Sequence, residues 1–393
     1  MRVCDAIPLQ QMDATMSAFL NPDKPPQPAA LPSPNPTRSF WIDTPGANPL
    51  AAEGSTGTLP QDADVCIIGS GITGVSAAYH LSQAARAGEP LKVVILEARD
   101  FCERFLLASQ LLMRKYGTAF SGVEFGGHNL WPLKFVTRLF QLTKDALPAL
   151  SLHTRTPVTS ISSPGTDSSG WVLTTPRGKI TTKYIIHATN AYASHLLPQL
   201  ARPDTGIIPT RGQVIATRAA VRASELFTCS WDGNTGFEYW FPRPTAAGAS
   251  SDAEKPRPLI ILGGGREAEA PRFEFGVTDD SSLGEHAGRV LRNFLPAVYP
   301  GKFEQETEPE MEWTGIMGFT KSRDPIVGHV PGLPGQYISA GYSGHGMPRA
   351  FSCASIVASM VACEMDGSTF ELPEWFPSAY LSSWTGLNNE HEP

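Results

Sequence analysis

The chain has 393 residues, of which 41% are hydrophobic, and its formal net charge at pH 7 is −7. A chain of this length can bury a large core and is expected to form two domains. No cluster of lysine and arginine stands out, so we expect no nucleic-acid partner. The N-terminal residues lack a basic region followed by an apolar core, and no window approaches the length of a membrane span. We therefore expect a cytoplasmic protein with no membrane partner.

The N-terminal residues 1–60 are rich in proline and alanine and are expected to form an extended or disordered arm. Within this arm, the cluster from Ser39 to Ile42 is apolar enough to dock on the main body. The six cysteines of the chain are scattered without CxxC spacing. This spacing predicts neither a metal site nor a set of disulfides.

The most informative pattern lies at residues 64–97. An apolar run ends on GxGxxG, a helix-compatible stretch follows, and a second apolar run closes on Glu97. This order is typical of a βαβ unit that binds a dinucleotide, although an ordinary strand–turn–helix with glycines used for packing is the alternative. Gly69 would make the tight turn, Gly71 would let the backbone approach a pyrophosphate, and Gly74 would let the helix pack closely on the strand.

The helix start in this unit would hold the phosphates through its exposed amides, and Glu97 would accept hydrogen bonds from ribose hydroxyls. The cofactor-binding residues predicted from this unit are Gly69, Ser70, Gly71, Ile72, Thr73, Gly74, Glu97, Ala98 and Arg99.

Further along, an amphipathic helix is expected between Leu130 and Leu147. Short β-rich runs then predict an antiparallel meander that returns into the parallel sheet and ends on a small-residue turn, where ligands of open α/β sheets bind. Later runs predict more strands and a helix. In chain order these segments are Val158–Ser162, Trp171–Thr175, Lys179–His187, the turn Ala188–Ala191, Gln213–Thr217, Phe237–Pro242, Leu259–Gly263 and the helix Leu283–Phe294.

A second strand, glycine turn and helix occur near the C-terminus. The strand Gln336–Ala340 leads into the turn Gly341–Met347 and then into an apolar helix from Ala350 to Glu364. The amides and helix dipole of this turn could stabilise the negative charge of a reduced flavin. The alternative is a helix cap with an incidental histidine.

At these motifs the chain resembles the FAD-dependent oxidoreductases of the D-amino-acid-oxidase type, which include sarcosine, glycine and γ-glutamylputrescine oxidases. The resemblance covers roughly residues 38–102 and 115–380. The matching segments are DADVCIIGSGITGVSAAYHL, VVILEARD, TPVTSI, IIHATNAYAS, PTRGQV, WTGIMGFTKSRDPIVG and YISAGYSGHGM.

This resemblance implies an α/β fold with a Rossmann-like FAD-binding domain and a second substrate domain, which is a mainly antiparallel β-sheet plus helix. The expected divisions are an arm at 1–60, the FAD-binding domain at 61–205 and 305–380, the substrate domain at 206–304 and a tail at 381–393. The resemblance also implies FAD without a nicotinamide partner. By analogy, the adenine would meet Val158, the diphosphate would lie along Ala188, Thr189, Asn190 and Ala191, and the isoalloxazine would face Gly341, Gly344, Gly346 and Met347.

The sequence departs from the family at three places. After Cys102 the flavin-facing loop and most of the following helical segment are missing, which indicates an internal deletion or wrongly joined exons. Met317 lies near the position where some relatives carry a flavin-linking cysteine, so non-covalent FAD is expected. Pro348 stands where some relatives place an oxygen-activating lysine, which leaves His345 as the nearest group to supply a charge.

The reaction implied is hydride transfer from the carbon of an amine or amino acid to flavin N5, giving an imine, with molecular oxygen as the acceptor. We take His345, Tyr342 and Arg323 as candidate catalytic residues. Arg211, Tyr239 and Trp240 are candidate substrate-binding residues, since a guanidinium can clamp a carboxylate and aromatic rings can wall an amine site or simply form the core.

Two alternatives to this oxidase stay open. Because the loop after Cys102 is missing, the chain could be a catalytically impaired member of the fold that acts as a binding or non-redox tailoring protein. An NAD-dependent dehydrogenase is the weaker alternative, since the C-terminal glycine turn would then have no role. The sequence leaves open whether an oxidase would serve nitrogen catabolism or secondary metabolism.

Overall fold

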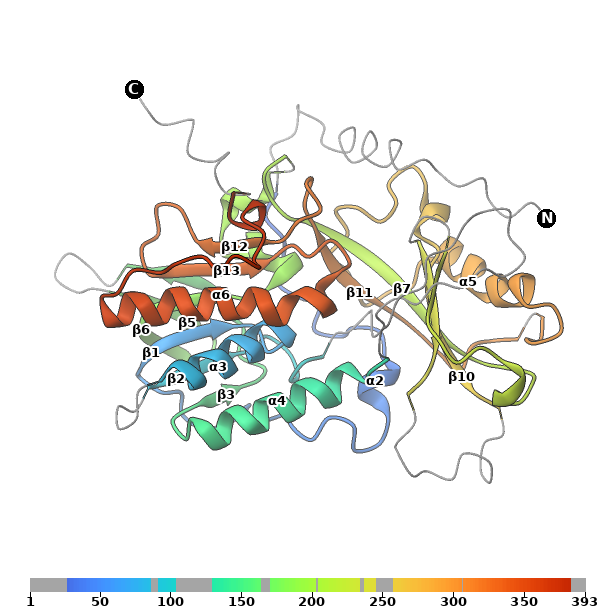
Figure 1. Ribbon diagram of the computed structural model, residues 1–393, viewed down its shortest axis with the longest axis horizontal. Helices are drawn as coiled ribbons and strands as arrows, with labels where there is room; N and C mark the ends of the chain where they lie inside the picture. Colours follow the sequence, from blue (N-terminus) through green and yellow to red (C-terminus); the bar gives the residue numbers. More distant parts are fainter. Residues whose placement is uncertain are drawn as a thin grey trace.

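The structure, a computed structural model, describes residues 27–85, 91–103, 129–163, 170–202, 204–233, 237–244, 257–305 and 307–382. These residues form two β-sheets, and helices pack on each of them (Figure 1). The α/β fold with a second, antiparallel sheet is thereby confirmed.

The first sheet is built around β1 (Asp62–Ile68), which pairs in parallel with β2 (Val93–Leu96) on one side and β6 (Gly178–His187) on the other. Two further parallel strands, β3 (Ser151–His153) and β13 (Gln336–Ala340), extend the sheet on either side. Because all these strands run in one direction, their carboxyl ends meet at one edge of the sheet. The antiparallel strand β12 (Ile326–His329) closes the side beyond β13.

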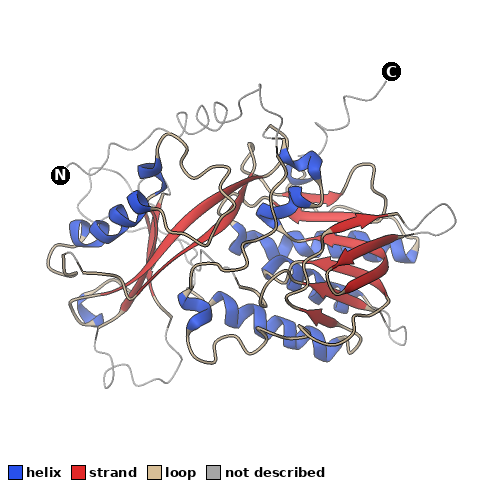
Figure 2. Ribbon diagram, turned by 180° about the vertical axis from the view of Figure 1, so that it is seen from behind, coloured by secondary structure: helices blue, strands red, loops and turns tan. Residues whose placement is uncertain are grey.

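Helices cover one face of this sheet and a small meander extends along the other (Figures 1 and 2). Val65 and Ile67 are fully buried on the helical side, whereas Cys66 and Ile68 alternate to the opposite core, as the period of a strand requires. The helices are α3 (Ile72–Ala84), α4 (Pro132–Ala146) and α6 (Gly346–Asp366), and the meander strands are β4 (Ser160–Ser162) and β5 (Trp171–Thr175), which pair with each other and with the first half of β6.

The helix α6 corrects one expectation from the sequence. Its 21 residues are long and apolar enough to cross a membrane by length and composition alone. In the fold it lies against α3 and the sheet, with Val357 and Val361 fully buried. This placement is that of a core helix.

The second sheet has five antiparallel strands in the order β11-β7-β10-β9-β8, and the helix α5 (Glu285–Val298) packs on it. The predicted strands at 213–217, 237–242 and 259–263 are present with shifted ends. The strands are β7 (Ile208–Arg218), β8 (Trp231–Gly233), β9 (Glu238–Pro242), β10 (Leu259–Gly264) and β11 (Met311–Phe319).

The strand β11 lies in this second sheet, although we assign residues 305–380 to the FAD-binding domain. All nine of its residues pair with β7, from Met311 opposite Ala216 to Phe319 opposite Ile208. The chain therefore returns to the first sheet only after Phe319. Pairing between strands about a hundred residues apart leaves no local signal in the sequence.

An aromatic cluster joins the N-terminal arm to the second sheet and to the start of α4. Trp41, on the short helix α2 (Phe40–Asp43), is fully buried, and its ring stacks on Phe241 at 6.4 Å and meets Trp131 edge-on at 5.6 Å. The expectation that residues 39–42 dock on the main body is therefore confirmed.

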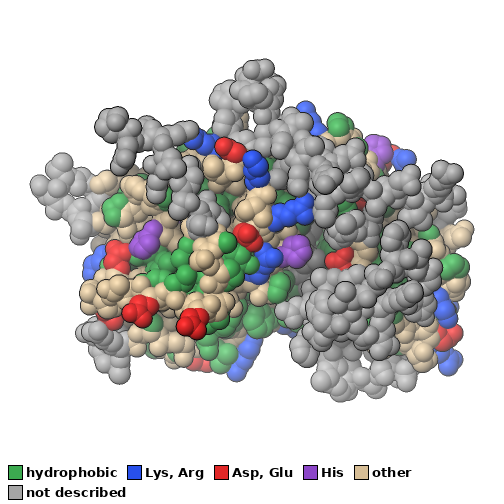
Figure 3. Space-filling model, turned by 45° about the horizontal axis from the view of Figure 1, so that its top comes forward, with side chains coloured by type: hydrophobic (Ala, Val, Ile, Leu, Met, Phe, Trp, Pro, Cys, Tyr) green, Lys and Arg blue, Asp and Glu red, His purple; other side chains and the backbone are tan. Residues whose placement is uncertain are grey.

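Charges of both signs are mixed over the surface. On the face seen in Figure 3, Lys and Arg side chains stand beside Asp and Glu side chains. The described ion pairs include several exposed ones, such as Lys92 with Asp62 and Arg289 with Glu285. Pairs of this kind contribute little to stability, so the fold depends on its apolar cores.

Removal of the buried indole should lower the stability of the fold. We expect Trp41→Ala to reduce the free energy of unfolding by about 3–5 kcal/mol, the usual cost of such a truncation in a core. The matched control is Trp375→Ala, because Trp375 is 61% exposed and its loss should cost under about 1 kcal/mol. Thermal melts monitored by circular dichroism compare the two. Equal shifts in the melting temperature would contradict the docking of α2.

Candidate functional site

The turn between β1 and α3 can be built only with glycine at two positions. Gly69 has φ +108°, and a Cβ there would come within 2.8 Å of the Ala188 carbonyl oxygen. A Cβ on Gly74 would lie 1.9 Å from the Gly69 carbonyl oxygen. Both glycines therefore serve the close contact of helix, turn and neighbouring strand.

Gly71 has a different role from its two neighbours. Its φ of −67° is accessible to any residue, and a Cβ there would meet no protein atom within 4 Å. The open space in front of it is a cavity of about 150 Å³ that Gly71 lines. The missing side chain of Gly71 therefore leaves room for a ligand, whereas those of Gly69 and Gly74 leave room for neighbouring backbone.

Glu97 holds the loop after β2 against the glycine turn that follows β1. One carboxylate oxygen accepts from the backbone N–H and the hydroxyl of Ser70, both at 2.8 Å, and the other accepts from the Arg99 N–H at 3.0 Å. A carboxylate offers about four acceptor positions, so Glu97 can still accept from a ligand hydroxyl. Glu97 and Ala98 both line the cavity.

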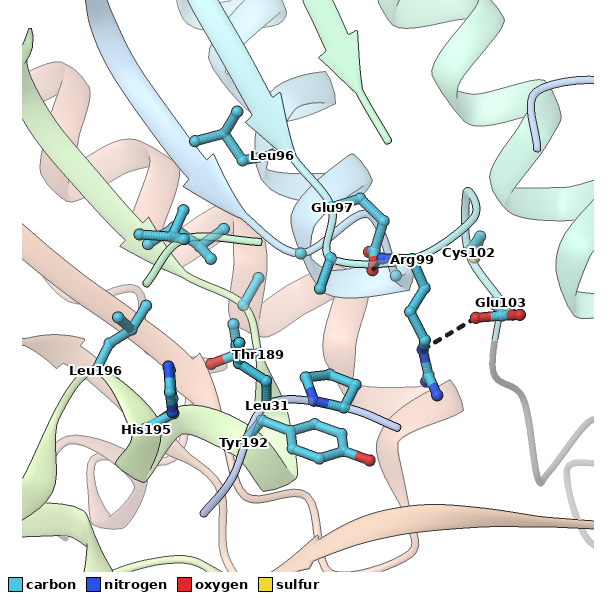
Figure 4. Close-up of a pocket in the computed structure, with 17 residues that line it drawn as sticks. Leu31, Leu96, Glu97, Arg99, Cys102, Glu103, Thr189, Tyr192, His195 and Leu196 are labelled. Carbon is cyan, nitrogen blue, oxygen red and sulfur yellow. Dashed lines mark hydrogen bonds and ion pairs between the residues drawn. The ribbon is translucent and has the colours of Figure 1, made fainter. Parts of the chain in front are cut away.

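The third loop at the same edge follows β6. Ala188 and Thr189 line the cavity, and the Thr189 hydroxyl is buried without a hydrogen-bond partner. Nε2 of His195 is buried in the same way and also lines the cavity. Since buried polar atoms are rarely left unpaired, these two atoms indicate a polar ligand. Figure 4 shows Glu97 and Arg99 on one side of this pocket and Tyr192 and His195 on the other.

Several other predicted cofactor residues lie around these loops. Val158 lines the cavity, where the adenine is expected. Asn190, with φ +45°, accepts the Gly341 N–H on its side-chain oxygen at 2.9 Å and so links the loop after β6 to the C-terminal glycine turn. Ile72 and Thr73 form the start of α3, and Ala191 is buried behind the cavity.

The second glycine turn connects β13 to α6. Gly341 and Gly344 have positive φ values of +80° and +83°, and Gly346 and Met347 begin the helix. A Cβ on Gly344 would contact Met317 and Phe319, both at 3.8 Å. The turn therefore lies directly against β11 of the second sheet, at the junction of the two domains.

The three predicted catalytic residues occupy different environments. Tyr342 is buried, and its hydroxyl bonds to Ser339 at 2.7 Å and to Thr73 at 3.2 Å, so it packs within the core. His345 is exposed, and its Nδ1 contacts the Ser343 carbonyl oxygen at 2.9 Å. Arg323 lies on the turn after β11, with φ +63°.

The three predicted substrate-binding residues are not brought to one place. Arg211 is committed to an ion pair with Glu274 and to the Ser282 hydroxyl. Trp240 faces α5 and donates to the Tyr299 hydroxyl at 3.1 Å, on the side of the sheet away from the first domain. Tyr239 lies on the opposite side of β9 against the main core, and burial raises the pKa of its phenol.

Arg266, which follows β10, is a candidate that sequence reasoning missed. Its guanidinium carbon lies 5.0 Å from the ring centre of Phe319, 5.7 Å from that of Phe237 and 5.8 Å from that of Phe275. Its Nη1 is buried with no hydrogen-bond partner. The signal that could have found it is the run of glycines at 263–265, which ends a strand immediately before an arginine.

The segment where a deletion is predicted, after Cys102, falls on residues 104–128, which lie outside the described residues. At its near end, the Cys102 N–H donates to the Ser70 hydroxyl at 2.9 Å, and burial raises the pKa of the Cys102 thiol. The Glu103 carboxylate pairs with Arg99 at 2.9 Å.

Comparison with known proteins identifies the class of this site. The sequence matches the family described as FAD dependent oxidoreductase over residues 64–110 and 119–360, which is more than half of the chain. The chain therefore belongs to this family, and FAD is its cofactor, as the sequence predicted. No curated protein matches the chain.

Solved structures share the fold at low identity. L-amino acid deaminase from Proteus vulgaris aligns with a TM-score of 0.56 at 13% identity, covering 84% of this chain and 98% of that chain. Glycine oxidase from Geobacillus kaustophilus aligns at 0.55 and 16%, with coverages of 82% and 98%. L-proline dehydrogenase from P. horikoshii aligns at 0.56 and 17%, with coverages of 84% and 99%.

The residues around the cavity fit the nucleotide half of FAD. The space in front of Gly71 allows a diphosphate to approach the backbone, and the start of α3 presents its free amides there. Glu97 would accept from the ribose, and the unpaired Thr189 hydroxyl and His195 Nε2 would find partners on the ligand.

A side chain at position 71 should block FAD while leaving the fold intact. We expect Gly71→Val to weaken FAD binding at least about tenfold, or about 1.4 kcal/mol, because the side chain enters ligand space. The melting temperature of the apoprotein should not change, since no protein atom lies within 4 Å of the new Cβ. Titration with FAD monitored by flavin fluorescence measures the affinity.

Gly71→Ala is the graded control for this experiment, because its single methyl should give a smaller loss of affinity. If both variants bind FAD as tightly as the wild type, the cavity in front of Gly71 does not hold the cofactor.

Proposed function

We propose that the protein oxidises the C–N bond of an amino acid to an imine, with molecular oxygen as the electron acceptor. The observation that carries this proposal is a caged arginine beside the C-terminal glycine turn. The caging ring of Phe319 reaches to within 3.8 Å of the position of a Cβ on Gly344, so Arg266 lies one ring away from the turn expected to face the flavin.

The buried guanidinium of Arg266 has carboxylates in its neighbourhood, but its Nη1 has no hydrogen-bond partner. Burial lowers the pKa of this guanidinium to about 10, with Glu267 and Glu274 opposing the shift and Arg323 adding to it. The side chain is therefore still charged at neutral pH. A substrate carboxylate would accept a hydrogen bond from this unpaired nitrogen.

An amino acid is thus the substrate class that the charges favour over a simple amine. The names of the three similar structures are those of enzymes acting on amino acids, which supports the same class. One of the three is named a dehydrogenase and one an oxidase, so reoxidation by oxygen is measured separately from reduction by the substrate.

The residues of this chain would position the substrate and stabilise charge. When bound, FAD supplies the hydride acceptor. Arg266 would fix the carboxylate, which places the neighbouring carbon over the turn at 341–347. The helix α6 begins within this turn, at Gly346. The positive end of its dipole and its first free amides would stabilise negative charge beside the turn. His345, Tyr342 and Arg323 stay predictions as catalytic residues.

Non-covalent FAD remains part of the proposal. Met317 lies beside Gly344, and a thioether does not form the link that a cysteine thiolate can form. A cytoplasmic location and a role in secondary metabolism stay predictions.

Anaerobic mixing tests the proposed reaction. Purified protein with bound FAD is mixed with a panel of amino acids and with the matching amines that lack the carboxylate, and bleaching of the flavin absorbance is followed. We expect amino acids to bleach the flavin and admission of oxygen to restore the colour with formation of hydrogen peroxide. A yellow protein that no amino acid bleaches contradicts the proposal, and a colourless protein that cannot be loaded with FAD favours the non-redox alternative.

Replacement of the caged arginine should separate amino acids from amines. We expect Arg266→Gln to raise the substrate concentration for half-maximal flavin reduction by about 10- to 100-fold for amino acids, as the loss of a charged hydrogen bond costs about 1.5–3 kcal/mol. Matching amines should be affected little. Arg289→Gln is the control, since Arg289 is exposed on α5 and pairs with Glu285. An equal effect on amines and amino acids would remove Arg266 from carboxylate recognition.

A further inference from the structure

The N-terminal arm contributes a wall to the nucleotide pocket. Residues 29–37, which we call the strap, cross the edge of the sheet where the three ligand loops meet. Leu31 and Pro32 of the strap line the same cavity as Gly71, Glu97 and Thr189 (Figure 4). Leu31 is 38% exposed, an apolar side chain that a ligand in this cavity would cover.

The first end of the strap is fixed to the FAD-binding domain. Ala29 is buried, and its N–H donates to the Ser194 hydroxyl at 2.8 Å. The Ala29 carbonyl oxygen lies 3.2 Å from Nδ1 of His195. Both partners belong to the 3-10 helix Asn190–His195, which follows the third ligand loop.

The second end of the strap is fixed to the substrate domain. The Thr37 N–H donates to the Asp280 carbonyl oxygen at 2.7 Å, and the Thr37 hydroxyl accepts from the Thr314 N–H at 2.8 Å. Arg99 connects this second anchor to the pocket. Its guanidinium pairs with the fully buried carboxylate of Asp280 at 2.9 Å, and its backbone N–H donates to Glu97, which lines the pocket. The strap is therefore anchored on both sides of the cavity.

The proline content of the strap makes this segment stiff. Pro32, Pro34 and Pro36 stand at alternate positions, and proline fixes φ and lacks an N–H. Such a segment favours the extended polyproline conformation, which needs no internal hydrogen bonds. A stiff strip held at its two ends loses little conformational entropy when it lies over a ligand.

The contact with Ala29 also orients His195. A carbonyl oxygen only accepts, so Nδ1 carries the proton and Nε2 of the neutral ring is an acceptor. His195 lines the pocket, and its Nε2 is buried without a hydrogen-bond partner. The strap thus presents an acceptor to the N–H or O–H groups of a nucleotide.

We propose that the strap closes the nucleotide pocket over FAD and slows its release, with His195 as a cofactor-positioning residue that the strap holds in place. The inference rests on FAD as the cofactor and not on the proposed reaction. Its test therefore measures FAD release and requires no substrate.

Two truncations separate the strap from the rest of the arm. Deletion of residues 1–36 removes the strap except Thr37, whereas deletion of residues 1–28 is the matched control that keeps it. After loading with FAD and dilution, release is followed by the rise in flavin fluorescence. We expect the longer deletion to release FAD at least about tenfold faster and the shorter one to behave as the full chain, since binding differences of this kind lie mainly in the dissociation rate.

Point variants keep the test decisive if the longer deletion does not fold. Ser194→Ala removes the acceptor of the Ala29 N–H and should speed release about threefold or more. His195→Leu should do the same, whereas His195→Gln, which can both donate to Ala29 and accept from the ligand, should restore slow release. Release rates equal to that of the full chain in Ser194→Ala and His195→Leu would overturn the proposal, as would a full chain that fails to bind FAD.

Discussion

The site depends on the parallel pairing of β1 with β2 and β6. This pairing brings the ends of three strands to one edge, so that the glycine turn, Glu97 and the loop at Ala188 surround one cavity. The contact of 2.8 Å that a Cβ on Gly69 would make with the Ala188 carbonyl oxygen shows how closely these loops approach. A side chain at position 69 would push the loop at Ala188 away from this turn and open the pocket.

The nucleotide half of the site could be predicted from the sequence because its determinants are local. The GxGxxG turn and Glu97 lie within about thirty residues, and each glycine has its own steric reason in the structure. The helices and the meander also follow from short-range periodicity. For the glycine turn, Glu97, the helices and the meander, the residues that form the sequence pattern are the same residues that make the contacts in the fold.

The junction of the two domains could not be predicted in the same way. β11 pairs with a strand about a hundred residues earlier, and the cage of Arg266 combines rings from three separate segments. Arg211 and Trp240 have side chains suited to binding an amino acid, but in the fold they interact with Glu274 and Tyr299. Which polar group is free for a ligand is decided by such distant contacts, and these leave no trace in local composition.

The anchors of the strap also order events during protein synthesis. Thr37 leaves the ribosome early, but its partner Thr314 follows 277 residues later. The three ligand loops are complete once β6 and its following turn have been made, long before this partner emerges. The strap can therefore be held at both ends only late in translation, when most of the chain has already been made.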